Sequence, residues 1–135
     1  MQGLTSALSS ELVGPGGCNE GFLRDDALLV VTLITDEDDT TSEGTVDQWR
    51  QAVIDAKGGD DEAVVMLGII SDVGLDGALC SGTESFPAEA PLMQEFVGSF
   101  PRHEKASICL ESYDEFFTTA IGTIDTACDE FVPPG

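Results

Sequence analysis

The sequence predicts an α/β fold in which strands and helices alternate as β-α-β-α-β-α around a parallel sheet. Two nearly continuous apolar runs, at 27–34 (ALLVVTLI) and 63–70 (AVVMLGII), are typical of strands that are covered on both faces of a parallel sheet. Amphipathic segments at helical spacing follow these runs. Because parallel strands need right-handed crossover connections, the alternation indicates a layered α/β architecture.

The segments around these strands follow from the same patterning. Leucines four residues apart predict a helical segment over 2–12, which a Gly-Pro-Gly-Gly run at 14–17 ends. Apolar residues at helical spacing predict a helix over 45–57, and two glycines at 58–59 are typical of its C-terminal end. A long polar loop is expected at 73–88.

The C-terminal third predicts a helix, a strand and a longer helix. A short helix is expected at 89–99, and residues 106–110 (ASICL) predict the third strand. Ser112 at the N-cap and Glu115 three residues later match a capping box that opens the last helix, which is expected to end near residue 130. The inward stripe expected on this helix is Phe116, Phe117, Ala120, Ile121, Ile124 and Cys128.

One domain is expected over 1–132, with 133–135 (PPG) as the start of a C-terminal linker. A sheet of three strands is small, and the run at 27–34 is too apolar for an edge that faces water. Either this run is the middle strand, or further strands lie beside it. We therefore expect the chain to be half of a domain, with self-association through an exposed strand edge as one consequence.

The net charge of the chain limits the classes of molecule that it can bind. The 135 residues carry 26 acidic and 5 basic side chains, a net charge of −21. Such a surface excludes nucleic acid and anionic membranes as direct partners, and favours cations, basic partners or solubility alone. No window approaches the roughly 18 apolar residues of a membrane span.

Four cysteines (Cys18, Cys80, Cys109 and Cys128) are spread along the chain without a CxxC pair, which weakens zinc and thioredoxin-like hypotheses. Two disulfides in an exported protein are the preferred interpretation, and four buried thiols are the alternative. The first residues lack the basic and apolar regions of a signal peptide. An extracytoplasmic protein would then have its signal upstream of this chain.

The strand ends provide the candidate site, because ligands of open parallel sheets bind at the carboxyl edge. Polar groups follow the first strand and recur at 71–72 and 111–114. Asp36 comes directly after the first strand and is the candidate ligand for Mg²⁺, with weaker outer contacts from Glu37 and Asp38. A solvated acidic turn is the alternative, and residues 71–72 are expected to hydrogen-bond their own turn.

Sequence motifs of enzymes are missing. With His103 as the single histidine and no GxSxG, P-loop or GxGxxG motif, no hydrolase triad or nucleotide site is predicted. A receiver-like, Mg²⁺-dependent phosphoacceptor remains an alternative, in which Asp36 accepts phosphate and Ser71 lies at the next strand end. The basic residue expected near the third strand end is lacking, since Lys105 precedes the predicted strand. A structural remnant without metal is a further alternative.

A family resemblance rests on residues 28–39 (LLVVTLITDEDD), a buried strand that runs into Thr-Asp and is followed by an amphipathic helix and another buried strand. This pattern resembles the fourth strand of von Willebrand factor type A (VWA) domains. With residues 21–27 before it, SIC at 107–109 and AC-E-F-PP at 127–134, the chain is similar to the bacterial, myxobacterial-like branch of large exported and surface proteins. The likeness covers nearly the whole chain but only the second half of the family's domain.

The resemblance implies a Rossmann-like three-layer fold and a non-enzymatic adhesion or protein-recognition module. It also implies a metal-ion-dependent adhesion site built from three loops, in which Asp36 matches the aspartate of the third loop. The Asp-x-Ser-x-Ser loop and the second-loop threonine have no counterpart, so the site is expected to be degenerate and to bind a divalent cation weakly. A carboxylate from a protein ligand would complete the coordination in a whole domain.

Placed on this fold, the cysteines are expected to pair as Cys80–Cys109 and Cys18–Cys128. The sequence alone leaves three connectivities open.

Overall fold

The computed structural model describes residues 1–82 and 87–133, so residues 134–135 of the expected linker lie outside the described part. Its elements are α1 (Gln2–Ala7), α2 (Ser10–Val13), β1 (Leu29–Thr35), α3 (Val46–Asp55), a 3₁₀ turn (Asp61–Ala63), β2 (Val64–Ile70), α4 (Pro91–Gly98), β3 (His103–Ser107) and α5 (Asp114–Glu130).

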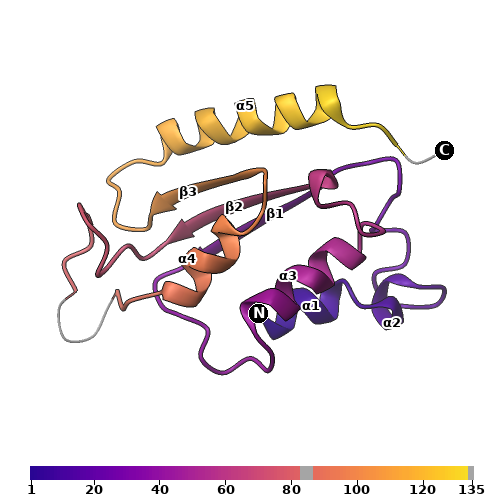
Figure 1. Ribbon diagram of the computed structural model, residues 1–135, viewed down its shortest axis with the longest axis horizontal. Coiled ribbons are helices and arrows are strands. Elements are labelled where there is room, and N and C mark those ends of the chain that lie inside the picture. The colour runs from indigo at the N-terminus through magenta and orange to yellow at the C-terminus, as the bar shows by residue number, and fades with distance from the viewer. Residues whose placement is uncertain (83–86, 134–135) are drawn as a thin grey trace.

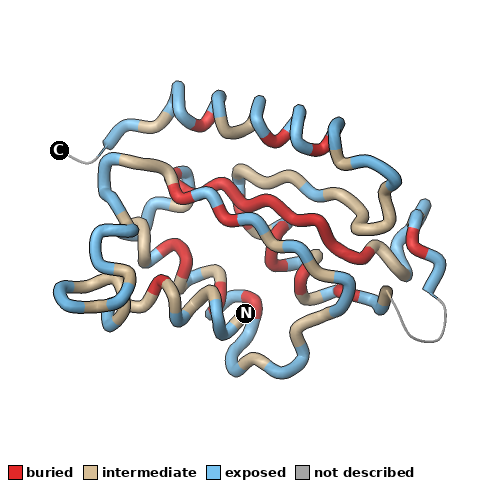
Figure 2. Tube along the Cα trace, turned by 180° about the vertical axis from the view of Figure 1, so that it is seen from behind, coloured by how far each residue is buried: buried red, intermediate tan, exposed pale blue. Residues whose placement is uncertain are grey.

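The three strands form one parallel sheet in the order β1-β2-β3, so β2 is the central strand. All seven residues of β2 are buried, and they form the long red run through the centre of Figure 2. An apolar strand buried from end to end is what an interior position in a parallel sheet requires. The expected α/β fold with a parallel sheet is confirmed.

Helices cover the sheet in two layers (Figure 1). On one side lie α3 and α4, with α1 packed against α3. Their core includes Trp49, Val53, Met66, Phe96 and Val97. On the other side α5 packs on β2 and β3, where its inward residues meet the second face of β2. That smaller core contains Val65, Leu67, Ile69, Phe116, Ala120 and Ala127.

Strand β1 lies at an edge of the sheet, so the first of the two alternatives for it, a middle position, is wrong. Its burial alternates along the strand: Leu29 and Val31 are buried against the α3–α4 layer, while Val30 is 41% exposed and Ile34 66% exposed. The exposed residues point to the side that carries α5. Because α5 packs on β2 and β3, the α5 side of β1 stays open to solvent.

Strand β3 begins three residues before the predicted strand at 106–110. Its register with β2 pairs Met66 with His103 and Ile70 with Ser107, after which the chain turns. Because β3 is an edge strand, its sequence is polar (HEKAS). The predicted strand was shifted toward the C-terminus because it followed the more apolar residues at 106–110. Lys105, expected ahead of the strand, lies within it.

The helix termini differ from the prediction in two places. The helical segment at 2–12 is split between α1 and α2, because Ser9 adopts an extended conformation (φ −65°, ψ 148°). The capping box at the start of α5 is not formed: Tyr113 is the N-cap, and the Ser112 hydroxyl accepts from the N–H of Asp114 (3.2 Å) instead of that of Glu115.

The inward stripe of α5 is narrower than predicted. Phe116 and Ala120 are buried, but Phe117 is 46% exposed, Ile121 59% exposed, and Cys128 is exposed. A helix that lies on a two-strand surface buries only a narrow stripe, and the flank next to it remains in solvent.

Gly68 allows close packing of α4 on β2, and Gly122 provides a matched control. A Cβ at Gly68 would lie 2.6 Å from Ile70 Cδ1 and 3.1 Å from Val97 Cγ2, whereas a Cβ at Gly122 would meet nothing within 4 Å. Gly68→Ala should therefore lower the free energy of unfolding by about 1–3 kcal/mol. Gly122→Ala should raise it by about 0.5–1 kcal/mol through helix propensity. Urea denaturation measures both, and equal effects of the two variants would contradict this packing.

Candidate functional site

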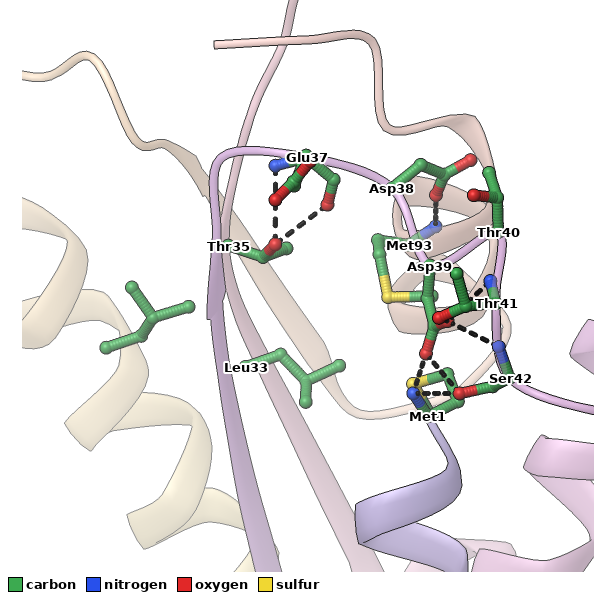
Figure 3. Close-up of a pocket in the computed structure, with 11 residues that line it drawn as sticks. Met1, Leu33, Thr35, Glu37, Asp38, Asp39, Thr40, Thr41, Ser42 and Met93 are labelled. Carbon is green, nitrogen blue, oxygen red and sulfur yellow. Dashed lines mark hydrogen bonds and ion pairs between the residues drawn. The ribbon is translucent and has the colours of Figure 1, made fainter. Parts of the chain in front are cut away.

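The carboxyl ends of the three strands meet at one edge of the sheet, where the loop after β1 encloses a pocket of about 440 Å³. Figure 3 shows this pocket with the loop folded over it. Apolar side chains of Leu33, Ile34 and Met93 line one part of it. The loop supplies the rest through carboxylates and hydroxyls, from Thr35 and Glu37 to Ser42.

Asp38 caps helix α4. Its carboxylate accepts hydrogen bonds from the N–H groups of Leu92 (3.2 Å) and Met93 (3.1 Å), which belong to the first turn of the helix. Ala90, at the N-cap, has no side chain that could satisfy them, and Pro91 at the start of the helix has no N–H. A carboxylate from the β1 loop therefore performs the capping function and also favours the positive end of the helix dipole.

Asp39 organises the remainder of the loop. Its carboxylate accepts from the N–H of Ser42 (2.9 Å), the N–H of Thr41 (3.2 Å) and the Ser42 hydroxyl (2.6 Å), and it also pairs with the amino group of Met1. Earlier in the loop, the Thr35 hydroxyl donates to the Glu37 carbonyl (2.7 Å). These bonds fix the loop around the pocket (Figure 3).

The predicted metal ligands do not form a common site. Asp36 is exposed and does not line the pocket, and its carbonyl accepts from the N–H of Ala88 (2.9 Å). Glu37 is exposed on the rim, and Asp38 is used by α4. Within residues 1–82 and 87–133, no three His, Cys, Asp or Glu side chains are grouped so that they could hold a metal ion. The metal site at Asp36 that the resemblance implies therefore stays a prediction.

A second cluster lies at the ends of β2 and β3. Asp72 accepts from the N–H groups of Leu79 (2.8 Å) and Cys80 (2.9 Å), and Cys80 forms a disulfide with Cys109, with a Cα–Cα distance of 5.3 Å. The Ser107 hydroxyl, at the end of β3, accepts from the N–H of Cys109 (3.1 Å). The cluster fastens the loop after β2 to the turn after β3, and it contains the expected Cys80–Cys109 pair.

The second expected disulfide is not formed, since Cys18 and Cys128 are both exposed, free thiols. Cys128 belongs to α5, on one side of the sheet, while Cys18 follows α2, which lies on the other side (Figure 1).

Sequence reasoning found the position of the acidic loop but missed what its members do. It named Asp38 as an outer metal contact, and its actual partners are more than fifty positions later in the chain. It expected residues 71–72 to bond their own turn. The Ser71 hydroxyl does so by accepting from the N–H of Val73 (3.3 Å), but Asp72 reaches across to Leu79 and Cys80. No local pattern reveals such distant partners.

The chain was compared with protein-family models, curated proteins and solved structures. None of them matches. The likeness to VWA domains therefore rests on the quoted residues alone. Among the residues described, no helix has the length and apolar character needed to cross a membrane.

The capping role of Asp38 predicts a loss of stability. Asp38→Ala leaves two N–H groups of α4 without their acceptor, so it should lower the free energy of unfolding by about 1 kcal/mol, the usual value of an N-cap. Glu37→Ala is the matched control because Glu37 is an exposed neighbour in the same loop, and it should change stability by less than about 0.5 kcal/mol. Equal losses in urea denaturation would show that Asp38 does not cap the helix.

Asp72 predicts a pH-dependent contribution to stability. Burial alone would raise its pKa, but the N–H groups of Leu79 and Cys80 and the Ser107 hydroxyl outweigh this, so the pKa lies below the ordinary 3.8. A carboxyl whose pKa is lower in the folded state stabilises the protein above the ordinary pKa, and this contribution is lost as pH falls through the folded value.

Asp72→Asn should therefore destabilise the protein at pH 7 by about 1 kcal/mol, through the weakened bonds to the two N–H groups. The difference from wild type should shrink below pH 3.8. Asp76→Asn, at an exposed position of the same loop, is the control. A difference of constant size between pH 7 and pH 3 in urea denaturation would refute this role of the ionised carboxylate.

Proposed function

We propose that this chain is a non-enzymatic protein-binding module of an exported or cell-surface protein, corresponding to the C-terminal part of a VWA-like domain. The observation that carries the proposal is an apolar surface left open on the α5 side of the sheet. It consists of Val30, Thr32 and Ile34 on β1 and Phe117 and Ile121 on α5, and is called the β1–α5 face below.

The two halves of the β1–α5 face adjoin each other. On α5, threonines 119, 123 and 126 line a hollow together with residues of β3, so this flank of the helix faces β3. At 3.6 residues per turn, Phe117 and Ile121 lie on the opposite flank, toward β1. The uncovered side chains of β1 and α5 therefore border the same strip of the sheet.

Apolar surface of this kind favours binding over a purely structural role. Val30, Ile34, Phe117 and Ile121 are each between 41% and 66% exposed. Isolated exposed apolar residues are common, but several that border one strip are typical of an interaction site. The disulfide Cys80–Cys109 supports an oxidising compartment, and with it export.

In this proposal a divalent cation has at most a weak role. Asp36 offers one exposed carboxylate, and a single carboxylate competes poorly with the water shell of Mg²⁺. The receiver-like alternative is less well supported. Lys105 donates from Nζ to the Gln94 carbonyl (3.4 Å), toward α4, and is not among the residues that line the pocket at the loop after β1.

Selection of displayed random peptides on the non-reduced protein tests the proposal without a known partner. Peptides enriched on the wild type should lose binding to the double variant Ile34→Asp/Ile121→Asp. They should keep it with Leu75→Asp/Leu79→Asp, because these leucines are exposed to a similar degree but lie in the loop after β2. Failure to enrich any peptide that depends on the β1–α5 face would favour the structural remnant.

A further inference from the structure

The edge of β1 presents an unused row of backbone hydrogen-bonding groups. The carbonyl of Thr35 accepts from the N–H of Ser71 (3.1 Å), so the backbone groups of Thr35 point to β2. Successive residues of a strand direct these groups to alternate sides, so residues 31 and 33 also face β2. The N–H and C=O groups of Val30, Thr32 and Ile34 then point away from the sheet, where the described residues contain no neighbouring strand.

The two edges of the same sheet differ in their protection. Edge strands of natural proteins usually carry charges that prevent pairing with other chains. Strand β3 follows this rule with His103, Glu104 and Lys105. Strand β1 (LVVTLIT) has no charged residue along its seven positions, although it is the edge with the exposed apolar face. An unprotected edge beside an apolar face is suited to receive a strand from a partner.

The charges at the ends of β1 determine which strand fits. Four consecutive carboxylates, at 36–39, follow the strand, and Asp25 and Asp26 precede it. The nearby cations are already engaged: Arg24 pairs with Asp26 (2.9 Å), and Lys57 Nζ donates to the carbonyls of Arg24 and Ala27 (both 2.7 Å). These two cations balance the charges of Asp25 and Asp26, whereas Asp36 and Glu37 at the carboxyl end remain exposed. The carboxyl end of the edge therefore favours positive charge on the incoming segment.

The same charges oppose a second copy of this chain as the occupant. Each copy carries a net charge of −21, so an edge-to-edge dimer would bring two strongly acidic molecules together. A basic partner instead gains attraction from this net charge and from the exposed carboxylates of Asp36 and Glu37.

The pocket at the carboxyl end of β1 can receive the basic residue. Leu33, Ile34 and Met93 offer apolar contact, and the exposed Glu37 lies on the rim. A long basic side chain places its methylene groups against apolar surface and keeps its charge in a polar environment. This arrangement of apolar wall and acidic rim matches a lysine or arginine at the end of an added strand.

We propose that β1 is extended by a strand from a partner protein, formed by an apolar segment of about seven residues with Lys or Arg at the end that meets the loop at 36–39. Main-chain hydrogen bonds to Val30, Thr32 and Ile34 hold the segment, its apolar residues cover the β1–α5 face, and its basic end meets the acidic loop after β1. The inference rests on the proposed binding function and specifies the chemistry and conformation of the ligand.

The probe is a fluorescein-labelled synthetic peptide, KKVTVIVTKK, whose binding to the full chain is followed by anisotropy. EEVTVIVTEE is the control for charge. Thr32→Pro removes an outward N–H and blocks the edge without touching the bonds to β2, and Thr32→Val keeps the N–H with a side chain of similar shape. The basic peptide should bind with a Kd in the micromolar range.

Thr32→Pro should raise this Kd at least about tenfold, and Thr32→Val less than about threefold. The acidic peptide should bind at least about tenfold more weakly, and added salt should reduce the difference. As a measurement that needs no variant, amide exchange of Val30, Thr32 and Ile34 in the wild type should slow when the basic peptide is added.

The outcomes separate this inference from the proposed function. Binding that survives in Thr32→Pro but is lost in Ile34→Asp/Ile121→Asp overturns strand addition and keeps the binding module. Binding that is unchanged in both variants overturns both. Equal affinity for the two peptides, no binding of the basic peptide, or a wild-type dimer that dissociates in Thr32→Pro would each overturn the basic strand as the occupant.

Discussion

Strand β2 is buried on both faces and paired at both edges, and this burial determines where the other described elements lie. Its seven residues need a strand at each edge and a helical layer on each face, because a parallel strand exposes two apolar faces and two rows of backbone groups. β1 and β3 satisfy the edges, α3 and α4 cover one face, and α5 covers the other (Figure 1). Among the described elements, the same arrangement leaves β1 with one open edge and one open face, since it pairs with β2 alone and only the α3–α4 layer covers it. The open surface is thus a consequence of how β2 is buried.

Two of the acidic residues at the strand ends accept hydrogen bonds from backbone N–H groups and so hold loops in place. Asp38 joins the β1 loop to α4, and Asp72 with the Cys80–Cys109 disulfide joins the β2 loop to the turn after β3. Each carboxylate accepts two N–H groups that would otherwise lack partners, which explains why aspartates occur at these places in the chain. These bonds attach the loops at the carboxyl edge of the sheet to neighbouring segments, while negative charge remains on the surface at Asp36 and Glu37.

Local patterns predicted the elements whose environment is uniform. β2 followed from an unbroken apolar run, and α3 from its periodicity and the glycines at 58–59, both of which have positive φ. The edge strands were less predictable. The apolar run of β1 gave no sign that one of its faces is exposed, and the third strand was predicted three residues too late because β3 is polar and the residues after it are more apolar. At the site, the sequence placed the acidic loop correctly at the end of β1. It could not give the partners of Asp38, because a helix cap supplied from a distant loop leaves no local pattern.

Among the residues that the structure describes, β1 pairs with β2 on one side and has no strand on the other. Amide hydrogen exchange of the free protein, resolved by residue with NMR, tests it most directly. Pairing on one side only should give an alternating pattern, with slow exchange at Val31, Leu33 and Thr35, whose N–H groups face β2, and fast exchange at Val30, Thr32 and Ile34. Uniformly slow exchange along the strand would rule out an open edge, because it would mean that a neighbour already occupies the outer side of β1.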